Sequence, residues 1–233
     1  MKYSIVLFDL DGTLLDTLDD LAASANAAIS AQGFPARTRE EVRSFIGNGV
    51  VKLLERSVGM EEAERLGLPA PIVDMEKLCA DFRGYYKLHC QDQTAPYPLV
   101  MQLLADLKAR GATLGVVSNK ADFATQLLCK DFFGELLDVV VGENEAAGIM
   151  RKPAADSLLL AIRKARALRG EAESMGHEDV VYIGDSEVDI FTARNAGVDH
   201  IGVTWGMKDK DFLAENGATV LVDSVEELMG ILL

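Results

Sequence analysis

The hydrophobic pattern of the chain alternates between short apolar runs and longer amphipathic stretches. Runs rich in Val and Ile occur at 4–8, 113–118, 137–142, 179–184, 200–204 and 219–222. Because these runs are apolar throughout, they predict strands that are buried on both faces, as in a parallel sheet covered by helices. Apolar residues at helical spacing fill most of the intervals, at 99–110, 121–132, 154–168, 187–196 and 224–232. The order predicts a Rossmann-like α/β core of three layers, with helices on both faces of a parallel sheet.

The pattern changes once, between residues 15 and 95, where only helical spacing is found. Apolar residues from Leu18 to Ile29 follow a helical period that ends near Gly33. Thr38 and Glu41 then have the spacing of a capping box at the start of another helix. We therefore predict a catalytic core formed by 1–14 and 96–233, with 15–95 as an inserted helical domain.

One charged stretch interrupts the pattern of the core. Residues 166–179 read RALRGEAESMGHED, with neither helical nor strand periodicity across the whole segment. We expect this segment to be a solvated connection between a helix and the following strand.

Composition and charge narrow the choice of partners. The 233 residues are 49% hydrophobic and 26% charged, which is typical of a globular protein. A net charge of -14 argues against nucleic acid or an anionic membrane as the main partner. Three Cys without metal-ligand spacing indicate free thiols. We expect a cytoplasmic protein, either a monomer or a homodimer, that acts on a small molecule.

Polar residues capable of catalysis follow the predicted strands. Since the carboxyl ends of parallel strands meet at one edge of a sheet, these residues are expected to gather there. In chain order they are Asp9 and Asp11, Ser118 and Asn119, Lys152, and finally Asp185 and Asp189.

Such a cluster favours phosphoryl transfer. Asp9 and Asp11 repel each other unless a cation lies between them, and oxygen ligands beside a phosphate suit Mg²⁺. Lys152 can neutralise a phosphoryl oxygen, and the helix N-termini and Ser118 can donate hydrogen bonds to a phosphate. One carboxylate can then attack phosphorus while another exchanges protons with the leaving group and water.

Four segments carry a resemblance to a known family. FDLDGTLLDT, VVSNK, RKP and GDSEVD resemble, in this order, the four motifs of the haloacid dehalogenase superfamily, and the insert resembles its C1 cap. Within the superfamily, FIGNGVVKLLERSV and the C-terminal segment from Ile201 are most similar to phosphoglycolate phosphatases. The resemblance implies a Mg²⁺-dependent phosphomonoester hydrolase that forms an aspartyl-phosphate and whose cap is a lid that determines specificity.

The resemblance also implies a role for each residue of the cluster. Asp9 would be the nucleophile and Asp11 the general acid and base. Mg²⁺ would be bound by the Asp9 carboxylate, the Asp11 backbone carbonyl and Asp185.

The remaining residues would bind the phosphate or orient its partners. Ser118 and the backbone amide of Asn119 would bind a phosphoryl oxygen, and Lys152 would hold nucleophile and phosphate together. Asp189 would orient Lys152 or a metal-bound water. Gly12 and Thr13 would form the turn that opens the catalytic loop.

Two further segments have more than one interpretation. Gly47, Asn48 and Gly49 are the candidate substrate contacts of the cap, because glycines allow close backbone approach, although a plain turn between helices explains them nearly as well. Trp205 lies just beyond a predicted strand, where core packing or shaping of the rim is expected.

Several alternative functions stay open at this point. A β-phosphoglucomutase-like phosphotransferase or a pyrophosphatase would use the same core. A dehalogenase is disfavoured because Asp11 supplies a second acid that dehalogenation does not need. A phospho-aspartate receiver module lacks a helical insert after its first strand, and nothing in the sequence supports an inactive scaffold.

Overall fold

The computed structural model describes residues 2–172 and 176–233, which divide into two compact units. The first unit comprises Met1–Asp16 with Pro96–Leu233, and the second comprises Thr17–Ala95. Where the chain leaves the first unit and returns to it, β2 (Leu15–Asp16) and β3 (Ala95–Pro96) pair as a two-stranded sheet.

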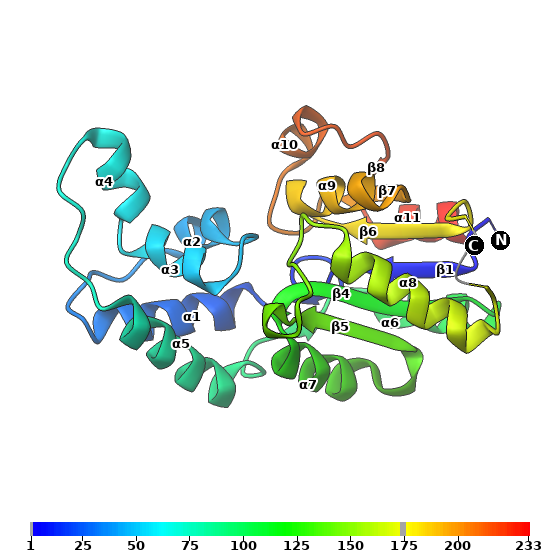
Figure 1. Ribbon diagram of the computed structural model, residues 1–233, viewed down its shortest axis with the longest axis horizontal. Coiled ribbons are helices and arrows are strands. Elements are labelled where there is room, and N and C mark those ends of the chain that lie inside the picture. The colour runs from blue at the N-terminus through cyan, green and yellow to red at the C-terminus, as the bar shows by residue number, and fades with distance from the viewer. Residues whose placement is uncertain (1, 173–175) are drawn as a thin grey trace. The chain divides into compact units, whose positions relative to one another are not determined.

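The first unit is built on a parallel sheet of six strands (Figure 1). The strands lie in the order β5-β4-β1-β6-β7-β8, and each pairs in parallel with its neighbours. This confirms the predicted α/β class. In chain order the strands are β1 (Ile5–Phe8), β4 (Thr113–Ala121), β5 (Val139–Glu143), β6 (Val180–Gly184), β7 (Asp199–Val203) and β8 (Leu221–Val222).

Helices cover both faces of this sheet. The helices are α6 (Val100–Ala109), α7 (Asp122–Phe133), α8 (Asp156–Arg169), α9 (Glu187–Ala196), α10 (Lys210–Glu215) and α11 (Val225–Leu232). Two 3₁₀ turns, η1 (Gly134–Leu136) and η2 (Glu145–Ala147), also occur among the described residues of this unit. Apolar residues of α8 and α9 pack on Leu7, Val117 and Tyr182, while α6 contacts β4 and α11. Because both faces are covered, all four residues of β1 are fully buried.

The second unit, all of whose residues are described, contains five helices. These are α1 (Leu18–Ser30), α2 (Arg39–Phe45), α3 (Val50–Ser57), α4 (Met60–Leu66) and α5 (Met75–His89). Helix α1 is central and contacts α2, α3 and α5. The predicted capping box is present, since Thr38 Oγ1 accepts from Glu41 N and Glu41 Oε2 accepts from Thr38 N.

A buried carboxylate fixes the start of α1. Asp20 is 2% exposed and accepts hydrogen bonds from the backbone N–H groups of Gln93 and Thr94 and from the Thr94 hydroxyl. The first turn of the unit is thereby joined to its last residues.

The prediction of a solvated connection at 166–179 was wrong at its start. Helix α8 continues to Arg169, and Arg166 is buried, with its guanidinium donating to Asp179 and, at 2.6 Å, to Glu171. Hydrogen bonds from Arg166 lower the pKa of Asp179 to about 2. Residues 173–175 of the predicted connection lie outside the described residues.

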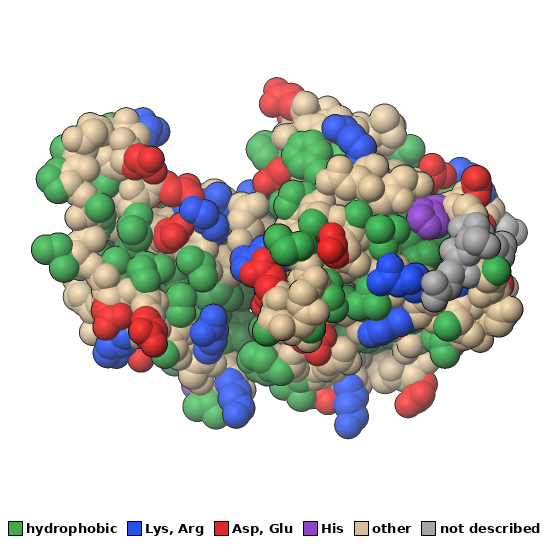
Figure 2. Space-filling model, in the orientation of Figure 1, with side chains coloured by type: hydrophobic (Ala, Val, Ile, Leu, Met, Phe, Trp, Pro, Cys, Tyr) green, Lys and Arg blue, Asp and Glu red, His purple; other side chains and the backbone are tan. Residues whose placement is uncertain are grey.

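The helices in the described part of the chain fall short of what a membrane-spanning helix requires. None of them is both long enough and apolar enough to cross a bilayer. On the face drawn in Figure 2, Lys and Arg side chains lie scattered among acidic ones.

Candidate active site

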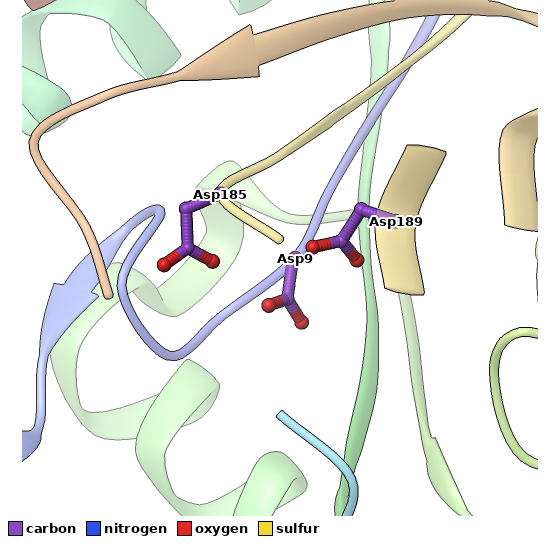
Figure 3. A group of neighbouring side chains, drawn as sticks. All are labelled: Asp9, Asp185 and Asp189. Atoms are coloured by element: carbon purple, nitrogen blue, oxygen red, sulfur yellow. The ribbon is translucent and has the colours of Figure 1, made fainter. Parts of the chain in front are cut away.

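Three carboxylates come together at the carboxyl end of the central strands. Phe8 pairs with Val116 and Ile183, so that Asp9 emerges between β4 and β6, and its N–H donates to Ile183 O at 2.8 Å. Asp185 directly follows β6, and Asp189 lies in the first turn of α9. Asp9, Asp185 and Asp189 are buried, and each offers one oxygen within 4.8 Å of the others (Figure 3).

Lys152 joins this cluster from the loop between β5 and α8. Its ammonium donates to Asp9 Oδ1 at 2.8 Å, to Asp189 Oδ1 at 2.7 Å and to the Tyr182 hydroxyl at 2.9 Å. The side chain of Asn119 holds the Lys152 backbone, because Asn119 Nδ2 donates to Lys152 O at 3.0 Å and Lys152 N donates to Asn119 Oδ1 at 2.8 Å. Asn119 therefore positions the lysine through its side chain.

Asp189 has its hydrogen-bonding capacity largely used by the protein. One oxygen accepts from Lys152 and lies 3.0 Å from the Tyr182 hydroxyl, which also lies 2.9 Å from Val117 O. The other oxygen accepts from Ser186 N at 3.1 Å and Ser186 Oγ at 2.6 Å. Asp189 thus fits a role in orienting Lys152 better than a role as metal ligand.

The carboxylate of Asp11 pairs with a residue that the sequence analysis did not single out. Lys120 Nζ lies 2.9 Å from Asp11 Oδ2, and both side chains are largely buried. Lys120 follows Ser118 and Asn119 at the end of β4, and its N–H donates to Ser118 Oγ at 3.2 Å. The Asp11 side chain is therefore adjacent to the phosphate-binding segment predicted at 118–119.

Asp185 is enclosed by backbone. Met207 N donates to its Oδ2 at 2.5 Å, and Thr13 Oγ1 lies 3.5 Å from its Oδ1. Gly12 has φ 86, and a Cβ at this position would lie 2.2 Å from Asp185 Oδ2. Both the conformation and the close approach require glycine in this loop after β1.

Burial and charge separate the ionisation of the three acids. Burial raises the pKa of Asp9 to about 7, although Lys152 opposes the rise. Burial, followed by the charges of Asp9 and Asp189, raises the pKa of Asp185 well above its usual range. Burial opposes ionisation of Asp189 as well, but the charge and hydrogen bonds of Lys152 outweigh it and lower its pKa. Lys152 stays protonated because Asp189 and Asp9 raise its pKa despite burial.

This donor set fits a divalent cation. Asp9 and Asp185 offer carboxylate oxygens in a buried place where a positive charge would relieve their mutual repulsion. Hard oxygen donors of this kind suit ions such as Mg²⁺. Within the acidic triad, Asp9 and Asp185 are therefore the residues that could hold a metal ion.

The structure brings together most of the residues predicted for the core. Asp9, Lys152, Asp185 and Asp189 contact or face one another, as described above. Asp11, Ser118 and Asn119 join this group through their bonds with Lys120 and Lys152.

Tyr182 and Lys120 are the residues that sequence reasoning missed. A phenol within the aliphatic strand VVYIG requires a hydrogen-bond partner when buried, and that was the available signal for Tyr182. Lys120 is adjacent to a predicted motif, but no periodicity indicates which acid it pairs with.

The predicted substrate contacts at 47–49 lie in the second unit. Gly47 and Gly49 have φ values of 127 and 84, and Gly49 directly precedes α3. Asn48 Oδ1 accepts from Arg56 Nη1 at 3.0 Å, and the same nitrogen donates to Phe45 O at 2.8 Å. Arg56 thus fixes the conformation of this loop.

The first unit is a Rossmann-like core with carboxylates and a lysine at the carboxyl edge of its sheet, and a helical insert follows its first strand. These features together define a class of phosphoryl-transfer enzymes. The sequence model of the haloacid dehalogenase-like hydrolases matches residues 6–203, and the chain belongs to this family. The similar proteins named in the next paragraph are phosphatases, and this chain is therefore a phosphatase as well.

The similar proteins extend over nearly the whole chain. A phosphoglycolate phosphatase of Agrobacterium fabrum is 33% identical over 206 residues, which are 88% of this chain and 82% of the relative. A phosphoglycolate phosphatase of Shigella boydii is 32% identical over 96% of this chain and 90% of the relative. A crystal structure from Lactobacillus delbrueckii subsp. bulgaricus, provisionally named a phosphoglycolate phosphatase, has a TM-score of 0.87 and 36% identity and covers 100% of this chain and 99% of its own.

Proposed function

We propose that this phosphatase is a Mg²⁺-dependent phosphomonoester hydrolase that acts on phosphoglycolate or a closely similar small acid through an aspartyl-phosphate at Asp9. The observation that carries the proposal is the contact of 2.8 Å between Asp9 Oδ1 and Lys152 Nζ beside Asp185. An acid used only for structure would not need a second buried acid close by. The names of the relatives support the choice of substrate.

In the first half-reaction, an Asp9 oxygen attacks phosphorus and the bond to the ester oxygen breaks. Protonated Asp11 gives its proton to that leaving oxygen, which departs as an alcohol. Lys152 neutralises Asp9 before the attack and the phosphoryl oxygens during it. Ser118 and the Asn119 backbone amide are proposed donors to one of those oxygens.

In the second half-reaction, ionised Asp11 removes a proton from water, and the resulting hydroxide attacks the phosphorus of the aspartyl-phosphate. Inorganic phosphate leaves and Asp9 is regenerated as a carboxylate. Lys120 holds the Asp11 carboxylate in place for both proton transfers.

Asp9, Asp185 and the Asp11 backbone carbonyl are the proposed metal ligands. A bound Mg²⁺ would polarise the phosphoryl group and offset its negative charge. Asp189 acts through Lys152 instead, because both of its oxygens are engaged by protein donors.

We also propose that the second unit is a cap that selects the substrate, with the Gly47–Asn48–Gly49 loop binding its carboxylate. The Arg56 hydrogen bond to Asn48 keeps this loop ordered, which reduces the entropy lost on binding. An Asn48→Ala variant should lose activity on phosphoglycolate while keeping activity on p-nitrophenyl phosphate, which carries no carboxylate. Equal losses on both substrates would contradict this role.

The proposed function is tested by a phosphate-release screen over phosphoglycolate, sugar phosphates, pyrophosphate and nucleotides, first with Mg²⁺ and then with EDTA. Phosphoglycolate should be the best substrate, and EDTA should stop turnover. A preference for a sugar phosphate or pyrophosphate would show that phosphoglycolate is not the substrate. Turnover in EDTA would show that the reaction does not depend on the metal.

The covalent step has its own test. After acid quenching of a reaction with ³²P-labelled substrate, label should stay on the protein, and Asp9→Asn should abolish both labelling and turnover, the latter by at least about a thousandfold. Asp211→Asn, at an exposed acid in the first turn of α10, is the control and should behave as wild type. Near-normal turnover of Asp9→Asn would exclude Asp9 as the nucleophile.

A further inference from the structure

A segment far from the four motifs closes around one proposed metal ligand. Residues Trp205, Gly206 and Met207 follow β7, and the Met207 N–H donates to Asp185 Oδ2 at 2.5 Å. The Trp205 indole N–H donates to Thr13 O at 3.2 Å, and its ring meets Tyr97 edge-on with centroids 6.5 Å apart. The 205–207 segment therefore contacts both the loop after β6 and the loop after β1.

Gly206 lies at the closest approach between these parts. A Cβ on Gly206 would lie 2.2 Å from Asp185 Oδ2 and 2.3 Å from Gly12 O. These distances are far below van der Waals contact, so any side chain would displace the carboxylate or the catalytic loop. Space alone excludes a larger residue here.

Asp185 is consequently held from three sides. Gly12 and Gly206 confine its carboxylate, and the Met207 amide binds one of its oxygens. A ligand that is already fixed loses little conformational freedom when an ion binds. Removing a group that holds a metal ligand in place commonly lowers the affinity for the metal by about 10–100-fold.

We propose that the 205–207 segment is a positioning element for the divalent cation, with Gly206 and the Met207 amide keeping Asp185 in the orientation that the ion requires. The inference rests on the proposed Mg²⁺ site. It assigns a function to a part of the chain where sequence reasoning expected only packing or shaping of the rim.

The test measures Mg²⁺ binding directly, by isothermal titration of the EDTA-stripped full chain and by the Mg²⁺-induced rise in melting temperature. Gly206→Ala should bind Mg²⁺ at least about tenfold more weakly than wild type and show a correspondingly smaller rise. Gly202→Ala is the matched control on β7, since its Cβ would meet the flexible end of Leu221 at 2.6 Å and should leave affinity within about twofold.

Each outcome decides between the two proposals. Gly206→Ala with wild-type affinity overturns the positioning role and leaves the proposed function standing, whereas a wild type that binds no Mg²⁺ overturns the proposed metal site itself. If Gly206→Ala does not fold by circular dichroism, Trp205→Phe carries the test, because it keeps an aromatic ring at this position and removes the indole N–H that donates to Thr13 O. An affinity of Trp205→Phe at least about threefold weaker supports the role, and unchanged affinity overturns it.

Discussion

Lys152→Met removes the cation on which the acidic cluster depends. The ammonium is nearly inaccessible to water and has three partners, at 2.8 Å from Asp9, 2.7 Å from Asp189 and 2.9 Å from Tyr182. Met keeps an unbranched side chain of similar length, so loss of charge is the main change. Two buried carboxylates then lose their positive partner.

The magnitude follows from this burial. Removing one member of a buried ion pair costs about 3–5 kcal/mol of the free energy of unfolding, because the remaining charge is left without compensation. The matched control is Lys210→Met, whose ammonium lies 2.6 Å from Asp223 with both side chains half exposed. Solvent screens an exposed pair of this kind, so the same substitution at a similar distance should change the free energy of unfolding little.

The loss of stability in Lys152→Met should also depend on pH. Lys152 lowers the pKa values of both Asp9 and Asp189, and without it both rise in the folded protein. A carboxyl whose folded pKa exceeds its unfolded one binds more protons when folded, so stability falls as pH rises between the two values. The penalty of Lys152→Met should therefore be largest near pH 8 and shrink towards pH 5.

Urea denaturation in EDTA, followed by circular dichroism at pH 5, 6.5 and 8, measures these free energies. A variant that unfolds at pH 8 and folds at pH 5 would agree with the argument. A loss below about 1 kcal/mol at pH 8, equal to that of Lys210→Met, or a penalty that grows as pH falls, would refute it.

Three further predictions concern neighbouring groups. Tyr182→Phe leaves Val117 O without its hydroxyl donor and should cost about 1–3 kcal/mol in urea denaturation, so an unchanged midpoint would contradict the hydrogen-bond assignment. Lys120→Met should slow the first half-reaction, measured as labelling of the protein in a single turnover, by about tenfold or more with alkyl phosphates but should spare it with p-nitrophenyl phosphate, whose leaving group needs no proton. Equal losses in this step would show that Lys120 does not act through Asp11 as the acid. Without metal, the melting temperature of wild type relative to that of Asp9→Asn should fall as pH rises from about 4 to 7, because the pKa of Asp9 is raised to about 7, and Mg²⁺ should flatten this relative fall in calorimetry. A metal-free difference between the two proteins that rises across this range would contradict that assignment.

The fold could be predicted because a doubly covered parallel sheet leaves a simple pattern in the sequence. Ile5 to Phe8 are apolar without alternation, and the structure buries every one of them. Strand ends that carry Asp9 and Asp185 then meet at one edge for topological reasons, since β1 lies beside β6.

The partners of charged residues could not be predicted in the same way. Arg166 looks like a surface residue of a charged segment, but it is buried against Asp179. Asp20 looks like a helix-start acid, but it binds residues 93 and 94, more than seventy positions away. Periodicity identifies the face of a helix that is apolar, whereas the pairing of charges depends on which distant segment packs against that face.

The position of β1 at the middle of its sheet determines how the enzyme can lose Asp9, the nucleophile proposed above. Backbone amides of a strand that is paired on both sides and shielded above and below exchange with solvent mainly when the entire unit opens. Asp9 is the first residue after that strand, and its own N–H bonds to β6. Deuterium uptake at residues 5–9 should therefore report global unfolding, and heat inactivation should follow it closely, with no earlier stage in which only the loop after β1 unfolds.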